Sequence, residues 1–524
     1  MAGTLGAVRS GTLARALPWA ALSAVVALAL AVRLYNLDGL VTYYPDSYAQ
    51  LRAVDNLLSG HFPISYLYPP GVALFLAAPF LLLPNTLEAM QATILVAGIA
   101  LVLLAYVAGT ATTGDRRAAL LFATAVAVGA PFVYYSRATL FDVITTLLIA
   151  TTLFLARPVS RRGSAACAAY GVLVFATITT RFSNVALLPA LFVASLPGEV
   201  ASLSRRQIAE HLRSRAVLTA LGVVVALYAA YLAVSFDTIT RFTSPQAGSI
   251  IELSGYLPRL ARYAEAALIG YGDQFYWQDG VAAVAVLAFA AAGARRLWST
   301  NRALLLPLAC VIALWPPVHA AYNVFAGRYA MPAFFCVLLL AALGLSRSIS
   351  WQRGLPQMWQ RVAAAALVTL GVTFFLGRHL ALDTAFLQQW PADVANGREV
   401  AYDEVRATLR DLDGPNAVLL SSQALAVDRA DPEIETLDLI KHSETYGINT
   451  DSIDRLLAYV SERRAAGKAV YFHYTEFEDV GSRFRKYELG FDAYFAAIEQ
   501  DYTVRELMRA DAGKRVQRLY LIAP

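Results

Sequence analysis

The sequence predicts a polytopic α-helical membrane protein with about 11 spans, one re-entrant or interfacial segment and a C-terminal α/β domain. Of its 524 residues, 58% are hydrophobic and 15% are charged, against about 25% charged in an average soluble domain. A soluble chain this apolar could not cover its own surface, so lipid must surround much of it. The arginines lie in short clusters between apolar runs, a pattern that indicates membrane topology and not a nucleic-acid-binding surface.

Spans are placed where about 20 mostly apolar residues follow one another. The first run, at 17–32, has features of a signal peptide but no small-residue cleavage site, so we interpret it as a retained span. The segment 71–84 is short and interrupted by prolines, and we expect it to be re-entrant or interfacial. The predicted spans are 16–34, 88–110, 117–135, 139–156, 165–181, 184–198, 216–234, 280–294, 303–320, 329–346 and 361–378.

The arginine clusters predict the orientation. With the N-terminus in the cytoplasm, every cluster between spans falls in a cytoplasmic loop, as the positive-inside rule requires. A full crossing by 71–84 would move the later clusters to the opposite side. The first outer loop, 35–87, the outer loop near 235–279 and the chain after about 380 then lie outside. We therefore expect any chemistry on the extracytoplasmic face.

Two domains are predicted: a membrane module at 1–380 and an extracytoplasmic α/β domain at 381–524. In the second part charged residues become frequent and no apolar run is long enough to span. Short apolar runs indicate strands, and amphipathic stretches between them indicate helices. The expected strands are 417–420, 469–473 and 518–522, and the expected helices are 398–412, 451–466 and 483–499.

Two acids stand at the outer ends of predicted spans. Asp46 follows the first span and opens a stretch whose apolar stripe is typical of an interfacial helix. Asp142 opens a later span, and an acid at membrane depth is costly enough to indicate a functional site. Structural explanations stay open for both. Asp46 can be a helix N-cap, and Asp142 can be a cap or the ion-pair partner of Arg137.

Four arginines at outer helix ends are candidates for binding a phosphate, because a guanidinium donates paired hydrogen bonds to phosphate oxygens. Each of them alone is more often a side chain that extends towards the membrane interface. A lone histidine near the outer end of a span, His319, is more often structural than catalytic. The four arginines are Arg52, Arg137, Arg181 and Arg328.

The three cysteines lie inside apolar stretches without metal-ligand spacing and without a nearby histidine cluster. We therefore expect neither a metal nor another cofactor, and we interpret the cysteines as small buried residues.

Four short motifs, in this order, carry a resemblance to a known family. On them, residues 16–345 resemble the polyprenyl-phosphate-sugar-dependent C-type (GT-C) glycosyltransferases, similar to the protein O-mannosyltransferases and the lipid A aminoarabinose transferases. The motifs are Tyr44-Pro45-Asp46-Ser47-Tyr48-Ala49, Tyr68-Pro69-Pro70-Gly71, Arg137 with Asp142, and Gly327-Arg328-Tyr329-Ala330-Met331-Pro332.

The resemblance implies roles for individual residues. Asp46 would be the catalytic base, Arg328 would bind the donor phosphate, and Asp142 would support the site. Many relatives carry two adjacent acids at the first position, whereas Ser47 follows Asp46 here, which puts metal binding in doubt. The polar and aromatic side chains in or near these motifs are candidates for substrate contact: Tyr44, Tyr68, His319 and Tyr329.

The function expected from these residues is transfer of a hexose or pentose from a polyprenyl-phosphate donor to an acceptor hydroxyl outside the membrane, with inversion. One carboxylate can take the hydroxyl proton, and arginines can stabilise the departing phosphate without a metal. The acceptor would be a glycan, a lipid or a protein, and the remaining partners are membrane lipids, with no nucleic acid. Two alternatives stay open: a transporter or flippase of a lipid-linked sugar, and a non-catalytic subunit of a cell-envelope glycan assembly machine.

Overall fold

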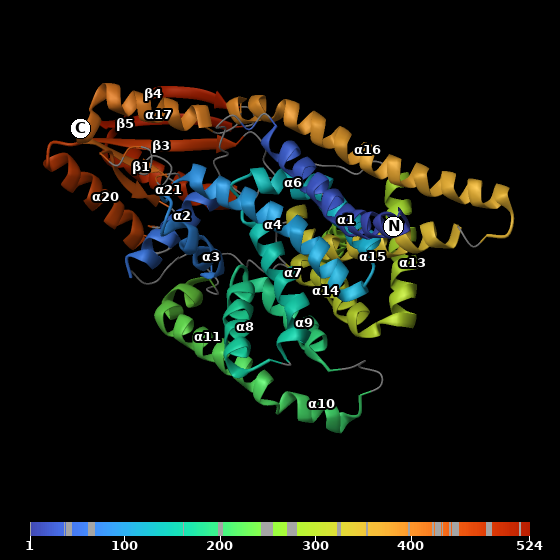
Figure 1. Cartoon of the computed structure of the whole chain (residues 1–524). Coiled ribbons are helices and arrows are strands. Elements are labelled where there is room, and N and C mark those ends of the chain that lie inside the picture. Colours follow the sequence, from blue (N-terminus) through green and yellow to red (C-terminus); the bar gives the residue numbers. More distant parts are fainter. Residues whose placement is uncertain are drawn as a thin grey trace.

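The computed structural model shows a large helical part and a smaller α/β part with one sheet near the C-terminus (Figure 1). It describes residues 2–35, 37, 45–60, 69–160, 162–197, 203–242, 255–269, 280–321, 326–352, 355–396, 399–421, 424, 431, 433–439, 442, 450–477, 485–512 and 515–523.

Within the described residues, the helical part contains α-helices and the short 3-10 helices η1 and η4. In chain order these are α1 (Ala2–Leu34), α2 (Pro45–Leu58), α3 (Gly71–Phe80), α4 (Leu87–Thr113), α5 (Arg116–Val128), α6 (Ala130–Arg137), α7 (Asp142–Val159), α8 (Ser164–Ile178), η1 (Phe182–Leu187), α9 (Leu188–Ser195), α10 (Arg205–Leu212), α11 (Arg215–Phe242), α12 (Tyr256–Ile269), α13 (Gly280–Thr300), α14 (Arg302–Ala320), η4 (Gly327–Ala330), α15 (Met331–Gln352) and α16 (Met358–Asn396).

Several of these helices are suited to a membrane. Among the residues that the structure describes, five helices are long and apolar enough to cross one, and a sixth crossing results if α5 and α6 form one bent span. The prediction of several apolar spans is confirmed, whereas the number of about 11 stays a prediction. The five are Leu87–Thr113, Asp142–Val159, Arg215–Val234, Arg302–Ala320 and Gly327–Gln352.

The helix boundaries differ from the predicted ones where the chain bends. The predicted span 117–135 consists of α5 and α6, which meet at an angle of 52°. Gly129 between them has an extended backbone, and Pro131 in the first turn of α6 has no N–H for an intrahelical bond. The predicted span 184–198 is the short pair η1 and α9, and the outer loop predicted at 235–279 contains the end of α11 and all of α12.

The segment 71–84 contains a helix too short to cross a membrane, and its re-entrant or interfacial placement stays a prediction. Its helix, α3, has 10 residues and is therefore about 15 Å long, half of a hydrocarbon core about 30 Å thick.

At the other end of the chain, α16 runs for 39 residues along the helical part to the sheet (Figure 1). The predicted domain boundary at 380/381 therefore lies inside a continuous helix.

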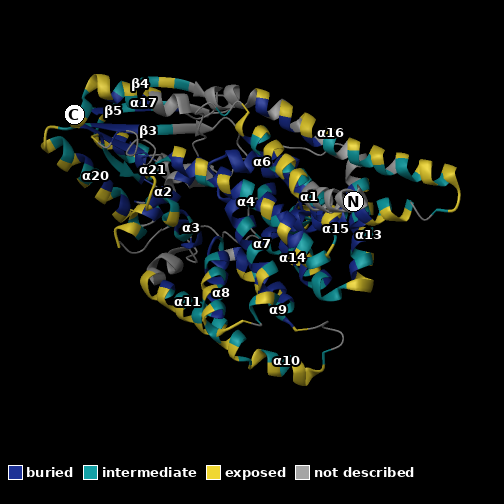
Figure 2. Ribbon diagram, viewed as in Figure 1, coloured by how far each residue is buried: buried dark blue, intermediate teal, exposed yellow. Residues whose placement is uncertain are grey.

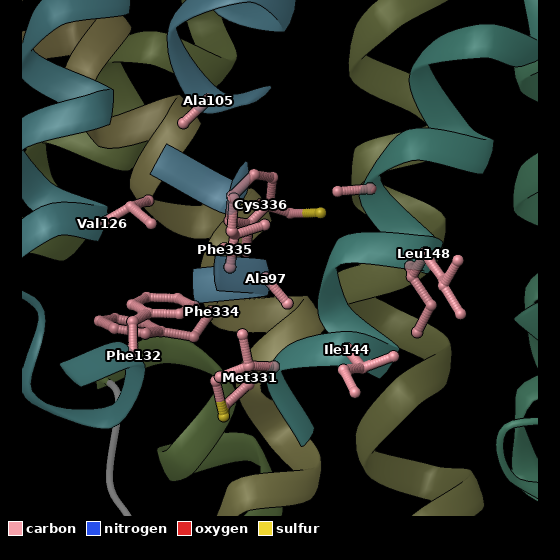
Figure 3. Packing of buried hydrophobic residues seen from close by; sticks show 14 of the residues in the cluster. Ala97, Ala105, Val126, Phe132, Ile144, Leu148, Met331, Phe334, Phe335 and Cys336 are labelled. Atoms are coloured by element: carbon pink, nitrogen blue, oxygen red, sulfur yellow. The ribbon is translucent and has the colours of Figure 1, made fainter. Parts of the chain in front are cut away.

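The core of the helical part surrounds α15, which packs against α5, α7, α13 and α14. Aromatic rings fill the centre. Phe132 stacks on Phe334 at 5.9 Å (Figure 3), and Phe122 meets Phe335 edge to face at 4.7 Å. Helices at the periphery, such as α11, instead turn large apolar side chains such as Leu218, Leu221 and Val225 outward (Figure 2). An apolar outer surface of this kind is expected for helices in lipid.

Helices α13 and α15 cross in backbone contact. A Cβ atom on Gly344 would lie 1.9 Å from the carbonyl oxygen of Phe289, and one on Gly293 would lie 1.9 Å from that of Leu340. Small residues at a crossing let two membrane helices approach closely and gain van der Waals contact. The two glycines therefore fix the distance between the helices.

The C-terminal part is a five-stranded sheet between helices. Its elements are α17 (Glu399–Leu412), η5 (Gly414–Asn416), β1 (Ala417–Ser421), β2 (Glu435–Asp438), α20 (Thr450–Ala465), β3 (Ala469–Phe477), α21 (Arg485–Asp501), β4 (Thr503–Ala512) and β5 (Arg515–Ala523). The three predicted strands and three predicted helices are confirmed, and β2 and β4 are additional. The strand order is β2-β1-β3-β5-β4, with β1 parallel to β2 and β3, and β5 antiparallel to β3 and β4.

Alternating residues of the strands build two hydrophobic layers, one on each face of the sheet. Val418, Leu420 and Phe472 pack towards α20 and α21, whereas Leu419 and Tyr471 belong to the cluster that contains α17. The sheet is therefore buried on both faces.

A buried polar chain crosses the sheet at His473. The Nδ1 atom of His473 lies 2.8 Å from the Ser421 hydroxyl, and Nε2 lies 2.6 Å from Gln517 Oε1. Because an amide oxygen only accepts, Nε2–H donates to Gln517 and Nδ1 accepts from Ser421. Burial lowers the pKa of His473 from 6.5 to about 4, and the hydrogen bond with Gln517 opposes this shift only in part.

We expect Gly344→Ala to destabilise the chain by about 1–3 kcal/mol, because the added methyl group overpacks the crossing of α13 and α15. Thermal unfolding in detergent measures this loss. Gly222→Ala on α11 is the control: nothing lies within 4 Å of its Cβ position, and alanine favours the helix. Equal melting temperatures for the two variants would contradict the packing argument.

We also expect the C-terminal domain to lose stability in acid. The unfolded chain protonates His473 near its ordinary pKa of 6.5, whereas the folded domain resists protonation down to about 4. Stability is therefore complete above pH 6.5 and falls between these two values, by about 3 kcal/mol in total. Hydrogen–deuterium exchange of β3 and β5, corrected for the intrinsic exchange rate, measures the loss. In His473→Gln, which cannot titrate, the decline should be shallower, and an unchanged decline would refute this assignment.

Candidate functional site

Asp142 binds two arginines from distant parts of the chain. Its Oδ1 atom lies 2.5 Å from Arg181 Nη2, and its Oδ2 atom lies 3.4 Å from Arg328 Nε. The carboxylate side chain is 3% exposed, so the ion pairs are shielded from bulk solvent. A buried carboxylate needs such partners, because an unpaired charge in a medium of low dielectric constant is strongly destabilising.

Aromatic rings hold the two guanidinium groups in place. Arg181 lies over the ring of Tyr329, with its Cζ atom 3.9 Å from the centroid, and also contacts Phe141 at 4.7 Å. Arg328 lies 5.3 Å from the same Tyr329 ring. Cation–π contacts of this kind orient the planar guanidinium without neutralising its charge. Tyr329 is therefore shared by both arginines.

His319 supports Tyr329 from behind. The two rings are 5.5 Å apart, and His319 also contacts the ring of Trp315 at 4.8 Å. His319 Nδ1 lies 3.0 Å from the Trp315 carbonyl and therefore donates to it, so Nε2 accepts from the Ser183 hydroxyl at 3.1 Å. The Trp315 indole N–H in turn donates to the Tyr329 carbonyl oxygen. His319 is buried in this network, which fits its structural interpretation.

The Pro-Pro-Gly motif positions the segment that carries Arg181. The Gly71 N–H donates to the Thr179 carbonyl at 2.8 Å. A Cβ atom on Gly71 would lie 2.2 Å from the Ala176 carbonyl oxygen, so only glycine lets α3 approach the end of α8 this closely. The chain then extends through Arg181 into η1.

Helix α2 joins the same region through Ser47. The Ser47 hydroxyl contacts both the carbonyl and the side chain of Thr139, the latter at 2.8 Å. Thr139 lies in the connection between α6 and α7, just before Asp142. Asp46, the neighbour of Ser47, lies in the first turn of α2 and not before it; its side chain lies outside the described residues. An acid in this turn interacts favourably with the helix dipole.

The structure does not bring two of the predicted phosphate-binding arginines to Asp142. Arg137, the last residue of α6, is buried, and its guanidinium lies at the C-terminal end of α1. There Nη1 donates to the Tyr35 carbonyl at 2.5 Å and contacts the Val32 carbonyl at 3.5 Å. Arg52 lies on α2 and forms a 4.0 Å ion pair with Asp438 of the C-terminal domain. Sequence proximity suggested Arg137 as the partner of Asp142, but the partners are Arg181 and Arg328.

Five of the ten predicted site residues therefore gather in one place: Asp142, Arg181, Arg328, Tyr329 and His319. Tyr44 and Tyr68 lie outside the described residues. Within the described ranges, no group of three or more His, Cys, Asp or Glu side chains could hold a metal ion.

Sequence reasoning missed the residues that position this cluster. Ser183 and Thr139 each make one decisive hydrogen bond, but nothing local distinguishes them from other hydroxyl residues in apolar segments. Ser183 lies two residues after Arg181 and directly before the predicted span 184–198, which is the one signal that could have marked it. The cluster carries a net charge of +1, because it contains one carboxylate, Asp142, and two guanidinium groups, Arg181 and Arg328. This charge favours the binding of one further anion.

The fold is similar to that of solved structures with 13–14% sequence identity. ArnT from Cupriavidus metallidurans superposes with a TM-score of 0.63 in the apo state, over 96% of this chain and 98% of that chain. The same protein bound to undecaprenyl phosphate gives 0.56, over 95% and 97%. The Archaeoglobus fulgidus oligosaccharyltransferase, tethered to an acceptor peptide with the NVT sequon, gives 0.55, over 96% and 74%.

No protein-family model and no curated protein matches the chain. The likeness to the solved structures confirms the expected resemblance to the C-type glycosyltransferases at the level of the fold. The apolar helices long enough to cross a membrane support the expectation of a membrane protein.

We expect Asp142 and Arg181 to be energetically coupled. Asp142→Asn and Arg181→Met should each lower the stability by up to about 3–5 kcal/mol. Asp142→Asn removes the anion that both arginines share, and Arg181→Met leaves the buried carboxylate with only the longer contact to Arg328. The double variant should lose less than the sum of the two, by about 1–3 kcal/mol. Thermal unfolding in detergent of the wild type, the two single variants and the double variant gives the coupling energy as a double-mutant cycle. The exposed pair Arg206–Glu210 is the control and should couple by less than about 0.5 kcal/mol. Additive losses at Asp142 and Arg181 would contradict the pairing.

Proposed function

We propose that this protein is a membrane glycosyltransferase. It moves a sugar from a polyprenyl-phosphate donor to an acceptor hydroxyl on the extracytoplasmic face and inverts the anomeric centre. The observation that carries the proposal is the buried cluster in which Asp142 holds Arg181 and Arg328 together. The fold shared with ArnT, whose structure was solved with undecaprenyl phosphate, supports the class of donor.

In this proposal the two arginines bind the donor phosphate. A sugar phosphodiester carries one negative charge, which matches the net charge of the cluster. After the sugar has left, the lipid phosphate gains further negative charge, and preorganised guanidinium groups stabilise that charge in the transition state. Asp142 and Tyr329 act as positioning residues, because they hold the guanidinium planes through the contacts described above.

Asp46 is the proposed base. Ser47 fixes the first turn of α2 on Thr139, which places Asp46 on a helix attached to the segment leading into Asp142. The acceptor oxygen attacks the anomeric carbon as its proton passes to the Asp46 carboxylate. The bond between that carbon and the phosphate oxygen breaks, and the electron pair leaves with the polyprenyl phosphate. A single in-line displacement of this kind inverts the anomeric centre.

The acceptor would approach from the side of the C-terminal domain. The Arg52–Asp438 contact places the end of β2 beside α2, the helix that carries Asp46. We propose that the N-terminus is cytoplasmic and that this domain is extracytoplasmic, where it borders the site and can bind a glycan, lipid or protein acceptor. Both hexose and pentose fit the proposed chemistry.

We expect Asp46→Asn to lower kcat by about 10²–10⁴-fold, because the amide cannot accept the acceptor proton. Binding of undecaprenyl phosphate should stay unchanged, since the phosphate is assigned to the arginines. Turnover of purified protein in nanodiscs and binding of undecaprenyl phosphate are the two measurements.

Asp55→Asn is the matched control, because Asp55 is an exposed acid on the same helix whose partner is Asn85. It should keep full turnover. Wild-type turnover in Asp46→Asn would exclude Asp46 as the base. A transporter would be favoured instead if the wild type transferred no sugar while lipid-linked sugar still crossed the membrane.

A further inference from the structure

Gln50 is a buried amide without a hydrogen-bond partner. Its side chain is 0% exposed, and within the described residues neither Nε2 nor Oε1 makes a hydrogen bond. Leaving a buried polar group unpaired costs about 1–3 kcal/mol, so native proteins contain few such groups. An amide has two donors and two acceptor lone pairs, so burying Gln50 without partners lowers the stability of the folded state.

The position of Gln50 suggests a reason. It lies one turn after Asp46 and Ser47, on the face of α2 that also buries Leu51 and Val54. An apolar residue would fit that face, as it does at these two neighbours. Two other polar groups of this part of α2 have partners: the Ser47 hydroxyl donates to Thr139, and the Leu51 carbonyl accepts from Asn85 Nδ2 at 3.0 Å. Gln50 therefore differs from these two described neighbours.

A second unpaired group lies on α7. The hydroxyl of Thr145 is buried one turn after Asp142 and has no hydrogen-bond partner among the described residues. Other threonines of the same helix donate to the carbonyl four residues earlier, for example Thr146 to Asp142 at 2.8 Å and Thr151 to Leu147 at 2.7 Å. Gln50 and Thr145 lie in the early turns of α2 and α7, and Ser47 links α2 to Thr139, three residues before α7 begins.

We propose that Gln50 and Thr145 form a neutral subsite for the hydroxyl groups of a sugar. Sugar hydroxyls both donate and accept, as an amide and a threonine hydroxyl do, whereas a phosphate is better matched by guanidinium groups. The inference rests on the proposed function and assigns the two parts of the donor to different residues. The arginines bind the phosphate, and Gln50 and Thr145 bind the sugar.

The test uses Gln50→Met, which keeps the approximate volume and removes the amide's hydrogen-bond donors and acceptor. Because it replaces an unpaired amide by an apolar group, the melting temperature should stay the same or rise. Binding of undecaprenyl-phosphate-glucose or undecaprenyl-phosphate-arabinose, whichever the wild type binds better, should weaken about 10-fold or more, the loss of about 1.4 kcal/mol of hydrogen bonding. Binding of undecaprenyl phosphate alone should not change. Thr145→Val should act in the same direction and serves as the second variant if Gln50→Met does not fold.

Two matched controls carry the same substitutions at satisfied positions. Gln91 is buried and donates to the Arg137 carbonyl at 2.7 Å, and Thr151 bonds within α7. Gln91→Met should lower the melting temperature without changing the preference for the sugar-bearing lipid, and Thr151→Val should leave that preference unchanged.

The outcomes separate the alternatives. Weaker binding of the sugar-bearing lipid assigns the subsite to the donor, and a raised KM for the acceptor alone assigns it to an acceptor sugar; both support the proposal. Equal weakening of bare and sugar-bearing lipid, or no change in either constant, overturns it. Lipid binding does not require turnover, so a failure of Asp46 as base leaves this result interpretable.

Discussion

The site depends on the ion pairs that the Asp142 carboxylate forms with two arginines. This carboxylate lies in the first turn of α7 and binds one arginine from the connection between α8 and η1 and one from η4. A buried charge without its partner is strongly destabilising, so these three segments must meet in one arrangement. The other features serve the same junction: Gly71 brings α3 to the residues before Arg181, and Trp315 with His319 supports Tyr329.

The sequence predicted the secondary structure better than it predicted contacts. Long apolar runs located the main helices, and short apolar runs located β1, β3 and β5, because both signals are local. The strand β2 has only four half-buried residues and left no such pattern. The break at Gly129 was also missed, since one glycine inside an apolar run is compatible with a continuous helix.

Site residues were predicted by type and by position at helix ends, and this succeeded where burial leaves few choices. A charged group in apolar surroundings needs a partner of opposite charge, and Asp142 forms ion pairs with Arg181 and Arg328. Arg137 satisfied the same criterion, yet its guanidinium binds the carbonyls at the end of α1. Which cation meets which anion depends on how segments far apart in sequence fold together. Gln50 was overlooked because a polar residue on an interfacial helix is ordinary until its burial is known.

The crossing of α13 and α15 has a consequence for how such a protein can diversify. Where two backbones touch, no rotamer change can absorb a larger residue, so Gly293 and Gly344 leave the chain almost no freedom to vary. Ligand preference must then be altered at places where side chains and not main chains meet. The early turns of α2 and α7 are such places, and they can exchange residues while the scaffold beneath them keeps its shape.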